Sequence, residues 1–203
     1  MTMDGFEEQL RTGPGDHAVP DISEAAAAAG LLDVAFTTVP SPVGELLIAV
    51  TPRGLVRVSY LDGALDATLD ALAARVSPRV LAAPRRLDPV RRELDEYFAG
   101  ARRRFDLALD WRLAQGFGRR VLQATAAIPF GAVSSYGAVA AAAGSPRAAR
   151  AAGNALGANP LPIVVPCHRI LHAGGGLGGY TGGVERKRVL LALEGRGAVT
   201  QRR

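Results

Sequence analysis

The chain of 203 residues contains one cysteine, Cys167, and no apolar stretch long enough and free enough of charge to cross a membrane. A lone cysteine cannot form a disulfide within the chain or supply a thiolate metal centre. The first residues lack the basic segment and the following apolar segment of a secretory signal. We therefore expect a cytoplasmic protein with a reduced thiol, no membrane partner and no disulfide scaffold.

Acidic residues are scarce in one part of the chain only. No aspartate or glutamate lies between Asp110 and Glu185, and residues 112–203 carry twelve basic residues against two acidic ones. Residues 34–111 are nearly balanced, with eleven basic and ten acidic residues, whereas residues 1–33 carry seven acids and one base. A bias towards arginine would explain the near absence of lysine but not the missing acids. The basic segment therefore favours a polyanionic partner such as nucleic acid.

Cys167 follows an apolar run and precedes two basic side chains. We predict that residues 163–166 form a buried strand that brings the thiol to a site. The adjacent His168 and Arg169 place positive charge beside the sulfur, which favours the thiolate. The alternative is a structural cysteine that packs as a small apolar residue, the usual fate of a free cysteine.

The first third of the chain predicts an extension followed by a small α+β domain. Residues 1–33 contain glycine, proline and an alanine run, and we expect a flexible extension with a short helix over residues 22–32 capped by Ser23. Residues 34–111 alternate apolar runs with Pro/Gly turns and then show helical spacing. The predicted elements are strands at 34–39, 45–50 and 55–60 in an antiparallel meander, helices at 64–75 and 88–99, a C-cap at Gly100, and a strand at 102–110.

Residues 112–203 predict a mainly helical second domain. The pattern places helices at 117–128, 135–143 and 147–156, the last with Ser145 as N-cap and Pro146 at its first position. The last two helices and their glycine-containing turn have the helix-turn-helix arrangement, which is also a common packing unit. The last helix has almost only small side chains, so it can approach the backbone of a protein or of DNA closely.

Several motifs in one order resemble the O6-alkylguanine-DNA alkyltransferases, over residues 34 to 195. They are Ile128-Pro-Phe-Gly131, Ser135-Tyr136, Arg150, Asn159-Pro160, Pro166-Cys-His-Arg169, Gly178-Gly-Tyr-Thr-Gly-Gly183 and Glu194-Gly195. The resemblance implies a protein that binds duplex DNA, extrudes an O6-alkylated guanine and transfers the alkyl group to its own cysteine, once and without a cofactor.

The resemblance also assigns the chemistry of transfer. Cys167 is the expected nucleophile, His168 accepts its proton through a water, and Glu194 orients the histidine. Asn159 holds the turn near the cysteine, although an Asn-Pro pair also initiates turns by itself. Family members with a zinc in the first domain use Cys and His ligands that this chain lacks, so we expect no metal.

DNA and base contacts follow from the same resemblance. Arg150 is expected to enter the base stack and Tyr136 to crowd the DNA backbone, although Arg150 would also suit a simple phosphate contact and Tyr136 a core position. The further residues expected to contact DNA are Arg147, Ser145 and Arg169. The residues expected to contact the base, besides Tyr136, are Tyr180, Thr181 and Leu177, in a glycine-rich stretch whose alternative reading is a flexible loop.

Two other classes of protein compete with an alkyltransferase. A non-catalytic sensor of alkylated bases would have no reason to keep Cys167 with His168 and Glu194. A cysteine hydrolase would place its Cys and His far apart in the sequence and would leave the basic helix-turn-helix unexplained. The leading hypothesis is a monomeric alkyltransferase. The sequence leaves open whether it accepts O4-alkylthymine or longer alkyl groups, and whether copies cluster on DNA.

Overall fold

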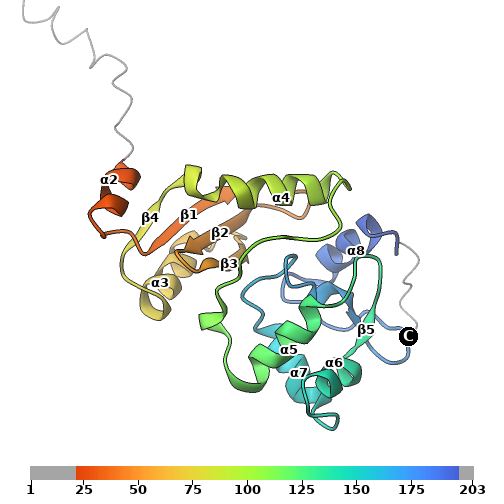
Figure 1. The fold of residues 1–203 in the computed structure, drawn as a ribbon. Helices are drawn as coiled ribbons and strands as arrows, with labels where there is room; N and C mark the ends of the chain where they lie inside the picture. Colours follow the sequence, from red (N-terminus) through yellow and green to blue (C-terminus); the bar gives the residue numbers. More distant parts are fainter. Residues whose placement is uncertain (1–21, 197–203) are drawn as a thin grey trace, which may run out of the picture.

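The computed structural model describes residues 22–196, which form two parts with a continuous core (Figure 1). The predicted flexibility of residues 1–21 lies outside the described residues. The first part contains α2 (Ile22–Ala28), β1 (Val34–Val39), β2 (Leu46–Thr51), β3 (Gly54–Tyr60), α3 (Leu65–Arg75), β4 (Val80–Ala82), the 3₁₀ helix η1 (Pro84–Leu87) and α4 (Asp88–Phe98). The second contains η2 (Trp111–Leu113), α5 (Gly116–Ala126), β5 (Ser134–Ser135), α6 (Tyr136–Ala142), α7 (Ala149–Gly157), η3 (Cys167–Arg169), β6 (Ile170–Leu171) and α8 (Val184–Leu193). The predicted α+β fold class is confirmed.

The first part is built around a four-stranded sheet with the order β3-β2-β1-β4. β2 pairs antiparallel with both β1 and β3, which confirms the predicted meander. The sequence pattern does not predict β4, which pairs in parallel with β1 over three residues. A strand this short carries too few positions for a period of two to be recognised.

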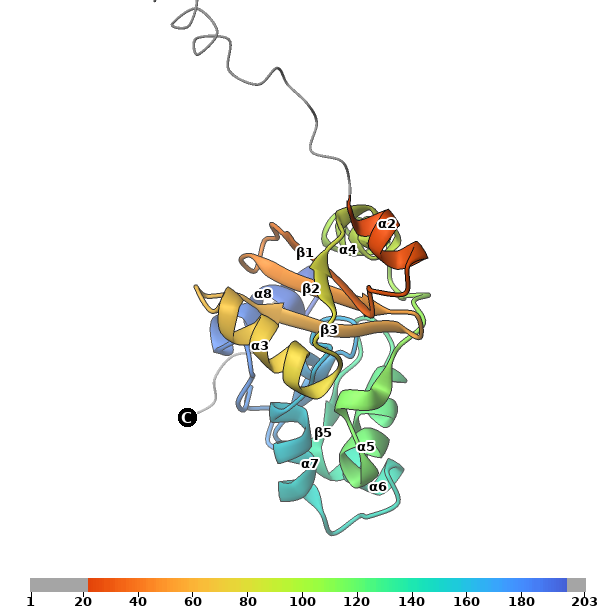
Figure 2. The same ribbon diagram turned by 90° about the vertical axis from the view of Figure 1, so that its left-hand side faces the viewer.

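Side chains of the sheet alternate between two faces, as the pleat of a β-strand requires. On β2, Leu46 and Ile48 pack into the core that α4 and the second part share, whereas Leu47 and Ala49 pack with Leu72 of α3. The two helices accordingly lie on opposite sides of the sheet (Figure 2). The second part of the molecule therefore packs, together with α4, on one face of the sheet.

The edge strand β3 joins the two parts of the molecule through its backbone. The Val58 N–H donates to the carbonyl of Pro160 at 2.9 Å, and the Leu55 N–H donates to the carbonyl of Ala108 at 2.8 Å. The second contact needs a glycine at position 54, because a Cβ there would lie 2.2 Å from the Ala108 oxygen. The Val58 bond fixes β3 against the loop that precedes Cys167, and the Leu55 bond fixes the beginning of β3 against residues 102–110.

Residues 102–110 do not form the predicted strand. Only a single bridge, between Leu55 and Leu109, connects them to β3. Arg102 holds the beginning of the segment in a loop, because its guanidinium pairs with Glu96 at 2.8 Å and with Glu93 at 3.3 Å. These ion pairs keep the beginning of the segment in a loop, and the segment does not pair with β3 along its length.

Residues 22–33 are part of the folded structure, so the expectation of flexibility is wrong for them. The buried side chain of Leu32 joins the core, and the carboxylate of Asp33 lies 3.2 Å from Arg79. Ser23 is the second residue of α2 and not its N-cap. The short helix predicted over residues 22–32 is confirmed as α2, which ends at Ala28.

The three predicted helices of the second part are confirmed, with one corrected boundary. α6 is capped by Ser135, whose Oγ accepts from the Ala138 N–H. α7 begins at Ala149, because the Ala148 N–H bonds to the Ser145 carbonyl and closes a turn there. Ser145 and the following proline therefore belong to the turn between α6 and α7, and the helix-turn-helix arrangement is kept.

Candidate functional site

Cys167 opens the short helix η3, after a tight loop that replaces the predicted strand. Residues 161–165 turn instead of extending: Ile163 has a φ of +75°, and the Val165 N–H bonds to the Leu161 carbonyl at 2.8 Å. A positive φ is costly for a β-branched residue, so the surrounding contacts must hold this conformation. The 3₁₀ turn at Cys167 also removes the constraint that adjacent residues on a strand face opposite sides.

Asn159 holds this loop and contacts the sulfur. Its Nδ2 donates to the Val165 carbonyl at 2.9 Å and lies 3.1 Å from Cys167 Sγ. Its Oδ1 accepts from the Leu161 N–H at 3.0 Å. One buried amide thus bridges both ends of the strained loop, which is the geometry expected of a residue that holds the turn.

A pocket of about 610 Å³ contains Cys167 in its lining. α6 and α7 contribute Tyr136 and Arg150, and the glycine-rich loop contributes Tyr180 and Thr181. Cys167 itself is 5% exposed. Pockets between about 300 and 1,000 Å³ commonly hold small molecules, so this one can accept a single base with its substituent.

The walls of the pocket are held by contacts between the helix-turn-helix pair and the glycine-rich loop. The half-buried ring of Tyr136 lies against His172, with ring centroids 5.3 Å apart, and close to Gly153 of α7. Thr181 Oγ1 donates to the Gly157 carbonyl at the end of α7, at 2.9 Å. The loop is therefore packed and hydrogen-bonded against α7, contrary to the alternative of a merely flexible loop.

The thiol of Cys167 is neutral at ordinary pH in this structure. Burial raises its pKa to about 11, against the opposing effects of the Asn159 hydrogen bond and the positive charge of Lys187. The expectation that His168 and Arg169 favour the thiolate is wrong. Burial lowers the pKa of His168, so the ring is uncharged, and a carboxylate neutralises the guanidinium of Arg169.

His168 and Glu194 form a buried pair behind the thiol. His168 Nε2 lies 2.9 Å from Glu194 Oε1, and both side chains are fully buried. Burial opposes ionisation of Glu194, but hydrogen bonds from His168 and Arg169 hold its pKa at about 2. Because the carboxylate is ionised, Nε2 carries the proton, and the buried Nδ1 has a free lone pair and no partner among the described residues. His168 is thus a neutral imidazole that the Glu194 carboxylate orients.

Two residues expected to contact ligands are buried elsewhere. Arg169 Nε and a second guanidinium nitrogen donate to the Glu194 carboxylate at 2.9 and 2.8 Å, and a third nitrogen donates to the Ile128 carbonyl. Its predicted contact with DNA is therefore wrong. Leu177 packs in a small cluster with Leu171 and Leu191, away from the pocket lining, so its predicted contact with the base is wrong as well.

Lys187 interacts with the thiol, and the sequence pattern did not predict this. It is completely buried in α8, and its Nζ donates to the carbonyls of Ile170 and Leu177. Burial lowers its pKa to about 8, while Cys167 raises it, so the two groups interact electrostatically. The available signal was that this is the only lysine of the chain.

The first part of the molecule also contributes two tyrosines that the sequence did not indicate. Tyr97 of α4 donates to Glu194 Oε1 at 2.7 Å. The hydroxyl of Tyr60, at the end of β3, lies 2.7 Å from the hydroxyl of Tyr180. Each contact joins residues that are about a hundred or more positions apart in the sequence, so no local pattern could predict it.

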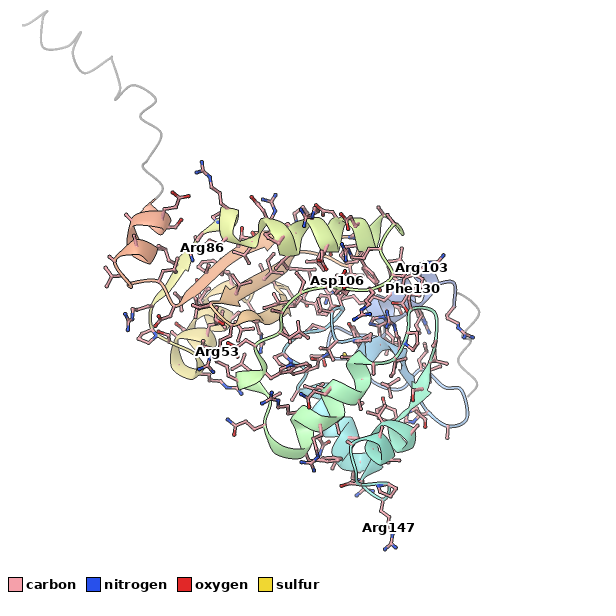
Figure 3. The ribbon with its side chains drawn as sticks, in the orientation of Figure 1. Arg53, Arg86, Arg103, Asp106, Phe130 and Arg147 are labelled. Carbon is pink, nitrogen blue, oxygen red and sulfur yellow. The ribbon has the colours of Figure 1, made fainter. Side chains whose placement is uncertain are left out.

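The remaining predicted DNA contacts lie on the surface beside the pocket. Arg147 and Arg150 are exposed, and neither has an ion pair among the described residues. Arg147 projects from the tip of the second part, away from Arg53 and Arg86, which lie on the first part (Figure 3). Ser145 is half-buried in the turn before Arg147.

Two further observations on the described residues concern metal ions and membranes. Within residues 22–196, no group of three His, Cys, Asp or Glu side chains is placed to hold a metal ion. In the same range, no helix combines the length and the apolar composition that crossing a bilayer would demand. The expected absence of a metal and of a cofactor stays a prediction.

Two family models cover most of the chain. Residues 34–111 match the ribonuclease-like domain of 6-O-methylguanine DNA methyltransferase, and residues 116–196 match its DNA-binding domain. A methylated-DNA–protein-cysteine methyltransferase of Mycolicibacterium paratuberculosis is 40% identical over 163 residues, 80% of this chain and 93% of that protein. The constitutive methylated-DNA–protein-cysteine methyltransferase of Bacillus subtilis is 38% identical, over 78% of this chain and 94% of that protein.

Solved structures show the same fold. The crystal structure of Mycobacterium tuberculosis O6-methylguanine methyltransferase has a TM-score of 0.69 and 36% identity, over 84% of this chain and 96% of that one. The crystal structure of M. tuberculosis OGT in complex with DNA has a TM-score of 0.68 and 36% identity, over 83% and 96% of the two chains. Fold and site define a class of two-part proteins in which a helix-turn-helix pair borders a pocket with one buried cysteine. The chain belongs to the 6-O-methylguanine DNA methyltransferase family.

Proposed function

We propose that this protein repairs DNA by moving the alkyl group of O6-alkylguanine irreversibly onto Cys167. The observation that carries the proposal is the position of the only cysteine in a base-sized pocket beside the helix-turn-helix pair, with its sulfur held by Asn159. Relatives of 40% identity are named methylated-DNA–protein-cysteine methyltransferases, which supports the activity. A non-catalytic sensor is not favoured, because it would need neither the thiol nor the base beside it.

The transfer step uses the neutral thiol and the neutral histidine together. Sγ attacks the alkyl carbon, so the S–C bond forms while the C–O6 bond breaks and the guanine leaves as an anion that takes up a proton. His168 Nδ1 accepts the thiol proton, through a water as the family resemblance implies, and Glu194 stabilises the resulting imidazolium. The buried Lys187 lowers the pKa of Cys167 and thereby favours the thiolate during attack. The thioether is stable, so each molecule acts once.

Base extrusion uses the residues at the mouth of the pocket. Arg150 both lines the pocket and lies exposed on α7, so its guanidinium can occupy the space that the base leaves. Tyr136, from the start of α6, crowds the nucleotide backbone, while Tyr180 and Thr181 contact the extruded base. The alanines around Arg150 let α7 lie close to the duplex. In this proposal the protein acts as a cytoplasmic monomer on duplex DNA.

The proposal is tested by the mass of the protein after incubation with a duplex that contains one O6-methylguanine. We expect a gain of one methyl group per chain, on the peptide that contains Cys167. Cys167→Ser should bind the same duplex with nearly unchanged affinity and gain no methyl group, because an alcohol is a far weaker nucleophile than a thiol or thiolate. Methylation of the serine variant at a rate near that of the wild type would overturn the assignment.

A further inference from the structure

Tyr60 connects the sheet of the first part with the pocket of the second. It is the last residue of β3, whose backbone is fixed to the second part by the Val58–Pro160 hydrogen bond. Its hydroxyl lies 2.7 Å from that of Tyr180, and the two rings meet edge to face with centroids 6.2 Å apart. Tyr180 in turn lines the pocket that contains Cys167.

The ring of Tyr60 is held by Arg186 and by the glycine-rich loop. The guanidinium of Arg186 lies over it, 4.5 Å from the centroid, and is itself fixed by Asp62 at 2.5 Å and by the Val43 carbonyl at 2.7 Å. The ring also lies against Gly182, where a Cβ would clash with the ring carbons. The position of the Tyr60 hydroxyl is therefore fixed by both parts of the molecule and by the glycine-rich loop.

The hydroxyl of Tyr180 depends on the hydroxyl of Tyr60 for its hydrogen bond. Burial raises the pKa of Tyr180 well above its usual value, so its hydroxyl stays protonated and needs a hydrogen-bond partner. Tyr60 is the only partner that the structure gives it among the described residues. The same ring of Tyr180 stands edge-on to His168, with centroids 6.4 Å apart. A change in its angle would alter the space beside the sulfur.

We propose that Tyr60 is a positioning residue that fixes the Tyr180 wall of the pocket and thereby sets which alkyl groups are transferred efficiently. The proposal rests on the proposed function, because it requires that the alkylated base occupy this pocket. While the hydroxyl pair is intact, Tyr180 cannot turn, and the space next to Cys167 suits a small alkyl group. Loss of the pair leaves one buried hydroxyl without a partner and removes the hydrogen bond that holds the Tyr180 side chain, so its ring is free to turn.

The test compares Tyr60→Phe with the wild type on two duplexes that carry O6-methylguanine or O6-benzylguanine at the same place. We expect methyl transfer to slow by about ten-fold, the range that follows from an unpaired buried hydroxyl. Benzyl transfer should change by less than about three-fold, so the benzyl-to-methyl rate ratio rises. Duplex affinity and the pH dependence of the rate should not move, because neither the DNA surface nor the thiol network has changed.

Matched variants separate positioning from a general loss of structure. Ser59→Ala removes the neighbouring hydroxyl on β3, which accepts from Arg57 at 2.8 Å, and should leave both rates unchanged. Tyr180→Phe should raise the rate ratio as Tyr60→Phe does, and the double variant should add nothing further. Tyr97→Phe, which removes a donor to Glu194, should instead slow both alkyl groups equally.

Equal slowing of both alkyl groups in Tyr60→Phe and in Tyr180→Phe would overturn the proposal and leave Tyr60 a structural role only. Methyl and benzyl transfer rates that both stay unchanged in these variants would overturn the proposal too. If Tyr60→Phe does not fold, Tyr180→Phe alone decides, since an unchanged rate ratio there contradicts the proposal. The proposed function fails separately, if the wild type gains no methyl group on Cys167.

Discussion

The basic residues of the second part occupy two contrasting environments. Arg147 and Arg150 lie exposed at and just before α7 and have no ion pair among the described residues, whereas Arg169 and Lys187 are buried behind Cys167. The buried pair is already engaged, Arg169 by Glu194 and Lys187 by backbone carbonyls. The high charge of this region therefore has two separate uses. In the proposed function the exposed arginines meet DNA, and the buried charges act on the thiol and on His168.

We expect the largest effect of a single substitution in the buried cluster of His168, Arg169 and Glu194. Glu194→Gln leaves the buried Arg169 without its counter-charge and His168 without an anion, so we expect methyl transfer to fall by about a hundred-fold and the free energy of unfolding by about 3 kcal/mol. The measurements are single-turnover kinetics and urea unfolding. DNA affinity should stay nearly intact, and Glu185→Gln, which changes the other, exposed acid of the region, should change neither quantity.

The same substitution also predicts a pH dependence of stability. The pKa of Glu194 is about 2 in the folded protein, below its ordinary value of 4.5, so its stabilising effect is complete above pH 4.5 and is lost as the pH falls towards 2. The stability difference between wild type and Glu194→Gln should therefore shrink over this interval. A difference that is constant from pH 5 to pH 2.5 would show that the carboxylate is not held ionised by its partners.

Lys187→Met should have an intermediate effect. The substitution removes the buried positive charge that lowers the pKa of Cys167, so the thiolate fraction at neutral pH falls. We expect about ten-fold slower alkylation of the thiol by iodoacetamide, the change that one unit of pKa produces. Arg188→Met, at the next position and paired on the surface with Glu185, is the control. Equal alkylation rates for Lys187→Met and the wild type would show that Lys187 does not lower the pKa of Cys167.

Arg147→Ala should have the smallest effect, and only on binding. An exposed arginine that contacts a phosphate adds about one to the slope of log affinity against log salt, so its removal should lower that slope by about one and weaken binding a few-fold for any duplex. Arg53→Ala is the control, because Arg53 lies on the first part of the molecule, away from Arg147 (Figure 3). A salt slope that does not change in Arg147→Ala would remove this residue from the DNA surface.

Local patterns predicted most of the elements and the central residue of the site. The meander, the helices at α3 and α4, and the helix-turn-helix pair follow from periodicity and turn residues, which act within a few positions. The family resemblance, and not a local pattern alone, assigned Cys167 and Asn159 to the site, and the structure brings them within 3.1 Å of each other. The strands and helices among these features depend on neighbours in the sequence.

The features that the sequence could not predict depend on distant partners. Arg169 looks like a surface base beside a cysteine, and only Glu194, 25 positions later, shows that it is buried. Tyr60 and Tyr97 meet their partners 120 and 97 positions away. The positive φ of Ile163 is imposed by the bonds of Asn159 across the loop, against the preference of its own side chain.

The division between exposed and buried charges is tested most directly by Arg150→Ala, with transfer rates measured on a methylated duplex and on the free O6-benzylguanine base. A free base needs no extrusion, so a residue that acts only on DNA should not affect its reaction. We predict that the variant slows duplex repair by at least about ten-fold, reflecting the few kcal/mol that unstacking costs, and leaves the free base almost unchanged. Equal slowing of both substrates would show that Arg150 supports the thiol or the fold, and would contradict the account.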